Sequence, residues 1–169
     1  MVQVDAVKTI PLTRGKFALV DDVDYEQLSR FNWYALKHTA IGRVTYYAAR
    51  TLSVGGKRYC SYMHREILGV TDTKIQVDHR DGNTLRNQRD NLRAATRKQN
   101  QQNRLKSGNK CSSLSKGVSW HRETGKWRAC IVTNYKQKHL GLFENEGAAA
   151  DAYDRAARQQ FGEFALTNS

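Results

Sequence analysis

The sequence predicts an α+β protein with a β-rich N-terminal domain, followed by a three-stranded antiparallel sheet packed on one helix. Three observations predict this class. Short runs of β-branched and aromatic residues, separated by turn residues, fill the first half of the chain. A Ser-, Gly- and Asn-rich stretch at 106–115 is typical of a linker. After it, three more strand-like runs precede an alanine-rich helical segment. We therefore expect domains at 1–105 and 116–169.

Local signals place the elements of the first domain. The polar residues 21–24 can cap a helix, and Gly55-Gly56 favours a tight hairpin. Thr96 and Gln99 have the spacing of a capping box. Residues 1–11 are typical of a strand or an arm. The other expected strands are 17–20, 33–37, 45–52, 57–62, 75–78 and 91–95, and the expected helices are 25–31, 63–68 and 96–105.

The second domain is expected to have strands at 117–120, 127–133 and 138–143, and a helix at 146–161. Alternation along the second strand turns Trp127, Ala129 and Ile131 toward the helix. By the same rule Trp120 faces inward with Val118. The alanines of the helix allow it to lie close to the sheet.

Composition limits the function classes. The chain has 28 Lys and Arg against 16 Asp and Glu, a net charge of +12, which favours a polyanionic partner. Eleven of these cations and one acid, Glu123, fall within 97–140. No apolar run is long enough for a membrane helix and no signal peptide is evident, so we expect a cytoplasmic protein with no membrane partner. The three scattered cysteines argue against a disulfide framework and against zinc.

The residues that carry chemistry lie between 75 and 105. A predicted strand ends in Asp78 and His79, a polar loop closes at Asn91, and a helix then presents Asn100. Carboxylate and amide oxygens suit a hard divalent cation, and an imidazole beside it suits general-base chemistry near neutral pH.

This segment, VDHRDGNTLRNQRDNLRAATRKQNQQN, resembles the HNH endonuclease family and its ββα-metal motif. The resemblance implies that Asp78 is a metal ligand and that His79 activates water against a DNA phosphodiester. It implies that Asn91 fixes the loop, and that Asn100, where many relatives have His, is the second ligand. The implied cofactor is Mg²⁺, with Mn²⁺ as a substitute. That cation would stabilise the developing charge and the 3′ leaving oxygen.

Two further residues are candidates for the catalytic group. Arg93, on the return strand, either faces the phosphate or is a solvated strand charge. His64, in a Met-His-Arg run before the motif, either contributes to the site or packs it as a hydrogen-bonded core histidine.

The second domain resembles the ethylene-response-factor (APETALA-type) DNA-binding domain. The matching residues are Lys116-Gly117-Val118, Gly125-Lys126-Trp127-Arg128-Ala129, Leu140-Gly141-Leu142-Phe143, Ala148-Ala149, Ala152-Tyr153-Asp154 and Ala156-Ala157. The resemblance implies DNA contacts from the sheet, through Lys116, Ser119, His121, Lys126 and Arg128, and from Tyr153 to a phosphate. Arg97 and Arg104 are expected on the phosphate backbone, or otherwise on a solvated face.

The sequence thus predicts a freestanding HNH endonuclease of the phage or homing type, which hydrolyses or nicks double-stranded DNA and acts as a monomer or weak dimer. If it is phage-encoded, it acts in the host cytoplasm. The first alternative is a DNA-binding regulator that retains the HNH scaffold without cleavage, and the second is an RNA-binding protein.

Overall fold

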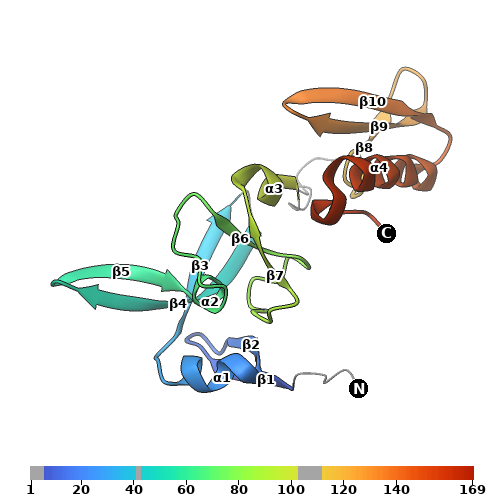
Figure 1. Cartoon of the computed structure of the whole chain (residues 1–169). Coiled ribbons are helices and arrows are strands. Elements are labelled where there is room, and N and C mark those ends of the chain that lie inside the picture. The colour runs from blue at the N-terminus through green and yellow to red at the C-terminus, as the bar shows by residue number, and fades with distance from the viewer. Residues whose placement is uncertain (1–5, 41–42, 103–111) are drawn as a thin grey trace, which may run out of the picture. The chain divides into compact units, whose positions relative to one another are not determined.

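The computed structural model describes residues 6–40, 43–102 and 112–169. The chain forms two compact units, Met1–Arg97 and Lys98–Ser169. Both contain small antiparallel sheets and helices (Figure 1), and the predicted α+β class is confirmed. Most of the predicted linker, residues 106–111, lies outside the described residues. Among the described residues, no helix is long and apolar enough to cross a membrane.

The first unit consists of three sheets and two short helices. Its elements, in chain order, are β1 (Val7–Pro11), β2 (Phe17–Asp21), α1 (Asp22–Ser29), β3 (Tyr34–Ala40), β4 (Arg43–Val54), β5 (Lys57–Tyr62), α2 (Met63–Ile67), β6 (Gln76–His79) and β7 (Leu92–Ala95). The sheets are the hairpin β1–β2, the three-stranded sheet β3–β4–β5 and the hairpin β6–β7.

Strand β4 belongs to two hairpins. Its first half pairs with β3 and its second half with β5, and the two ladders share only Ala49. The β4–β5 hairpin therefore extends beyond β3 (Figure 1). The turn at its tip is the predicted glycine pair, and both glycines have positive φ, 56° at Gly55 and 74° at Gly56.

Helix α1 begins at Asp22, three residues before the predicted start, and ends at Ser29. Asp21 occupies the N-cap position, but its side chain makes no capping hydrogen bond. It instead accepts bonds from the backbone N–H of Arg89, at 2.7 Å, and from Gln88 Nε2, at 3.2 Å. The cap position thus falls within the predicted residues 21–24, but the Asp21 carboxylate anchors a loop far along the chain and does not cap the helix.

One hydrophobic core joins the sheets of the first unit. Its largest fully buried side chains include Met63 and Val20, and Val77 and Leu92 extend it beneath β6 and β7. Because the β6–β7 hairpin packs on this core, the residues at its end are held by a rigid support.

The second unit contains α3 (Arg97–Gln102), which begins at the boundary, then β8 (Val118–His121), β9 (Lys126–Thr133), β10 (Lys136–Phe143), α4 (Glu146–Phe161) and the 3₁₀ turn η1 (Gly162–Phe164). The strand order is β10–β9–β8. Helix α4 has the predicted bounds. Asn145 caps it by accepting from the N–H of Ala148 at 2.8 Å, and Ala149 and Ala152 pack against Val118 and Ala129 of the sheet.

Two details of this unit were not predicted. Trp120 is 40% exposed although Val118 is buried, because it lies opposite Trp127 further along the ladder and packs edge-to-face on that ring. The end of the predicted linker is also ordered against the unit, since the buried Ser113 donates to Glu146 Oε1 at 2.6 Å.

Candidate functional site

The β6–β7 ladder places a carboxylate and a guanidinium opposite each other. Asp78 pairs with Arg93 in the register, and both side chains are buried. Arg93 donates to Asp78 Oδ2 from Nε, at 2.8 Å, and from its terminal nitrogen, at 2.6 Å. Arg93 is therefore not a solvent-exposed charge on the strand, which was one of the two alternatives.

His79 follows Asp78 at the end of β6 and is only 5% exposed. Its Nε2 lies 3.3 Å from Asn87 Oδ1. Burial lowers the pKa of His79, while the hydrogen bond to Asn87 and the nearby Asp78 carboxylate act in the opposite direction. The imidazole is therefore neutral at physiological pH, as a proton acceptor must be.

Asn91 ties the two ends of the loop between β6 and β7 together. Its Nδ2 donates to Asp81 Oδ1 and to the carbonyl of Arg86, both at 2.9 Å, and its Oδ1 accepts from the N–H of Asp81 at 3.1 Å. The Asn91 carbonyl also accepts from Arg80 N–H. These contacts account for a loop-fixing role of Asn91.

His64, in α2, lies against His79 with ring centroids 5.2 Å apart in an edge-to-face arrangement. Tyr62 stacks on His64 at 5.4 Å, and Tyr47 lies beside both histidines, 5.8 Å from His64 and 6.3 Å from His79. His64 Nδ1 is buried without a hydrogen-bond partner. The alternative that His64 is a hydrogen-bonded core histidine therefore does not hold for this nitrogen. Burial first, and then the neighbouring His79, lower the pKa of His64 to about 3.

Asn100, the other predicted metal ligand, lies in α3 and is half-buried. It falls in the second compact unit, so its place beside Asp78 stays a prediction. Among the described residues, no group of three or more His, Cys, Asp or Glu forms a metal cluster. The predicted set contains one carboxylate and one amide oxygen, a donor chemistry that fits a hard cation completed by water.

Sequence reasoning missed Asn87. This residue is fully buried, and its side chain lies within hydrogen-bond distance of the His79 ring. A polar residue inside a polar loop gives no sequence signal of burial. Only the packing of the loop against β2 reveals it.

Most of the predicted DNA contacts of the second unit lie on or beside its sheet. Ser119 and Arg128 are cross-strand partners, with Arg128 Nε 3.4 Å from Ser119 Oγ. His121 Nδ1 lies 2.9 Å from Thr124 Oγ1, and Lys126 pairs with Glu144 at 2.6 Å. Arg97 is exposed at the start of α3, and Arg104 lies outside the described residues.

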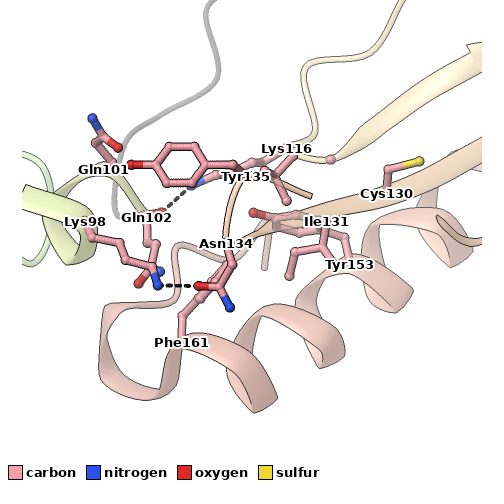
Figure 2. A pocket seen from close by; sticks show the side chains of 12 residues that line it. Lys98, Gln101, Gln102, Lys116, Cys130, Ile131, Asn134, Tyr135, Tyr153 and Phe161 are labelled. Atoms are coloured by element: carbon pink, nitrogen blue, oxygen red, sulfur yellow. Dashed lines mark hydrogen bonds between the residues drawn. The ribbon is translucent and has the colours of Figure 1, made fainter. Parts of the chain in front are cut away.

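Two predicted contacts are turned inward. Lys116 lines a pocket of about 340 Å³ with α3 and the end of β9 (Figure 2), and its ammonium donates to the carbonyl of Gln102. Burial lowers the pKa of Lys116 to about 8. Tyr153 is 4% exposed, and burial raises its pKa to about 12. The ring of Tyr153 fills the space beside Gly117, so little of this side chain is exposed, and its contact with a phosphate stays a prediction.

The fold and the site define a class of α+β protein. In this class a strand, a polar loop and a return strand pack on the core, and the first strand ends in an aspartate and a histidine, here Asp78 and His79. The family model for HNH endonucleases matches residues 66–102. An uncharacterised HNH endonuclease of Acanthamoeba polyphaga mimivirus is 32% identical over 156 residues, covering 92% of this chain and 76% of the relative. The chain belongs to the HNH endonuclease family.

Two other relatives match parts of the chain. Protein 3.8 of Escherichia phage T7 is 36% identical over 89 residues, 53% of this chain and 72% of that protein. The APETALA2-like protein 2 of Oryza sativa subsp. indica is 50% identical over 46 residues, 27% of this chain but only 11% of that protein. No solved structure matches the chain.

Proposed function

We propose that this protein is a metal-dependent endonuclease that hydrolyses a phosphodiester bond of double-stranded DNA. The observation that carries the proposal is the burial of His79 at the end of β6, beside the Asp78–Arg93 pair and at the start of a loop pinned by Asn91. The family membership supports the same reaction.

His79 accepts a proton from the attacking water, whose oxygen forms a bond to phosphorus while the bond to the 3′ oxygen breaks. The released oxygen takes a proton from solvent. Asp78 and Asn100 would hold Mg²⁺ or Mn²⁺, and a cation bound there supplies Lewis-acid stabilisation of negative charge on the phosphate. Arg93 already donates to Asp78 Oδ2, so the carboxylate would be shared between the guanidinium and the cation.

Charge supports DNA as the substrate. Between Lys37 and Arg65 the chain has no Asp or Glu, and this stretch forms most of the three-stranded sheet and α2. Its cations are Lys37, Arg43, Arg50, Lys57, Arg58 and Arg65. Arg50 is paired with Glu66, and the other cations leave this stretch with an excess of positive charge, which attracts the phosphate backbone.

The second unit is proposed to position the nuclease on DNA. Its likeness to part of an APETALA2-like protein and the sheet residues Ser119, His121, Lys126 and Arg128 support this role. Lys116 is left out, because its ammonium is engaged inside the unit.

The test is cleavage of supercoiled plasmid with Mg²⁺ or Mn²⁺, beside an EDTA control. We expect His79→Ala to abolish nicking, and His38→Ala, at an exposed strand position, to leave it unchanged. Circular dichroism checks that both variants are folded. The ratio of nicked to linear product reports whether one or both strands are cut.

The alternative function is DNA binding without cleavage. Wild-type protein that shifts DNA in a gel but leaves phage and bacterial DNAs intact with either metal would replace the nuclease by a regulator. Stronger competition by duplex RNA than by duplex DNA would favour the RNA-binding reading.

A further inference from the structure

Asn87 is a fully buried polar residue that the proposed reaction does not use. Its amide Nδ2 donates to the carbonyl of Leu85 at 3.2 Å, and this bond sets which end of the amide faces which way. The carbonyl end, Oδ1, therefore faces His79 Nε2, at 3.3 Å. Because an amide oxygen only accepts hydrogen bonds, Nε2 must carry the proton.

Strand β2 holds Asn87 in this place. The N–H of Asn87 donates to the carbonyl of Leu19 at 2.7 Å, and the N–H of Leu19 donates to the carbonyl of Leu85 at 2.9 Å. The Asp21 carboxylate also accepts a hydrogen bond from the N–H of Arg89, at 2.7 Å. These bonds fasten the backbone of Asn87 and of its loop neighbours to β2, and the bond from Nδ2 to the Leu85 carbonyl then holds the side chain.

We propose that Asn87 is a positioning residue that holds His79 in the Nε2–H tautomer, so that Nδ1 carries the lone pair. A neutral imidazole has one proton, and a proton held on Nε2 leaves Nδ1 as the basic nitrogen. The use of that lone pair to activate water rests on the proposed function. The tautomer itself does not.

The test reads the tautomer directly. Full-length protein labelled with ¹⁵N-histidine is measured by two-bond ¹⁵N–¹H correlation NMR, and the His79 signals are assigned by their loss in His79→Gln. We expect the Nε2–H pattern for wild-type His79 and for Asn87→Asp, which keeps an oxygen acceptor. In Asn87→Ala we expect a shift toward Nδ1–H. Asn83→Ala, in the exposed part of the same loop, serves as the matched control and keeps the wild-type pattern.

Cleavage is measured in parallel. We expect Asn87→Ala to slow nicking by about 10- to 100-fold, the range for residues that orient a ligand or base, with DNA affinity unchanged. An Nδ1–H pattern in the wild type, or an unchanged Nε2–H pattern in folded Asn87→Ala, overturns the proposal. If Asn87→Ala does not fold, the wild-type spectrum alone still tests the proposal, because an Nδ1–H pattern for His79 would overturn it. If the wild type does not cleave DNA, the proposed function fails while the tautomer assignment stands or falls by the spectra.

Discussion

Asp78 and Arg93 lie opposite each other in the β6–β7 ladder, and each side chain is 6% exposed. The carboxylate that we assign to metal binding is thus already neutralised by a partner from the neighbouring strand. A buried carboxylate without such a partner would carry a large desolvation cost.

Removal of the guanidinium should therefore be costly. We expect Arg93→Ala to lower the free energy of unfolding by about 3–5 kcal/mol, because the buried Asp78 loses the guanidinium that neutralises it. Urea denaturation measures this change. The double variant Asp78→Leu/Arg93→Met should recover most of the loss, and a single-variant effect below about 1 kcal/mol would show that Asp78 does not depend on Arg93.

His64 should make the first unit sensitive to acid. Its folded pKa of about 3 lies below the ordinary value of 6.5, so the unfolded chain binds a proton more readily. Stability is then complete above pH 6.5 and is lost as the pH falls toward 3. Between pH 7.5 and 5.0 the loss from this ring is about 2 kcal/mol. His64→Phe should reduce the pH dependence of urea unfolding by that amount, and an unchanged pH dependence contradicts the assignment.

Asp21 should matter more than its neighbour Asp22. Asp21 is buried and accepts two bonds from the site loop, so Asp21→Ala should lower the unfolding free energy by about 1–3 kcal/mol. The Asp22 side chain is 59% exposed and lies 3.6 Å from Lys8, so Asp22→Ala should change it by less than about 0.5 kcal/mol. Equal effects in thermal denaturation would mean that Asp21 does not anchor the loop.

The face of the β4–β5 hairpin beside the site should contact DNA. Side chains alternate along β5, so Arg58 lies on the face of Tyr62, which stacks on His64, and Lys57 lies on the opposite face. Arg58→Ala should weaken DNA binding and reduce the slope of log affinity against log salt by about 1. Lys57→Ala is the matched control. Fluorescence anisotropy over a series of KCl concentrations distinguishes them, and an equal loss in both variants argues against a one-sided contact.

Two glycines of the second unit should respond differently to alanine. Gly117 has φ +74°, and a Cβ there would meet the Tyr153 ring at 2.0 Å and the Cys130 carbonyl at 2.7 Å. Gly125 has φ +61° with open space around it. Gly125→Ala should cost about 1–2 kcal/mol from backbone strain alone. Gly117→Ala should cost clearly more, since overpacking adds about 1–3 kcal/mol. Thermal denaturation compares them, and equal costs would show that the unit relaxes around Gly117.

The sequence predicted best what local signals determine. Helix α4 has the expected bounds because its cap, Asn145, and its alanine face are contiguous in the chain. The Gly55-Gly56 turn is equally local. The spacing of Asp78, His79 and Asn91 also brought them to one hairpin end, because a strand, a loop and a return strand bring the ends of the loop together.

The parts that were not predicted depend on contacts between distant segments. The pairing of Arg93 with Asp78 requires the strand register, and the role of Asp21 requires a loop 67 residues further on. Asn87 and Lys116 are polar residues that pattern reasoning places in solvent, and tertiary packing buries them wholly or in part. The alternation of side chains along β8 correctly predicted the face on which Trp120 lies. It did not predict that the buried core ends before Trp120, which is therefore partly exposed.

The clusters of buried apolar side chains found among the described residues each draw on one unit alone: one cluster in the first unit and two in the second. Among the described residues, each of these clusters is therefore completed by side chains of its own unit. The apolar core of the first unit would therefore keep its packing if the sheet and helix at 118–161 were exchanged for another module. Under the proposed function, exchange of the part that begins at β8 would change where the nuclease is positioned and would keep both proposed metal ligands, Asp78 and Asn100.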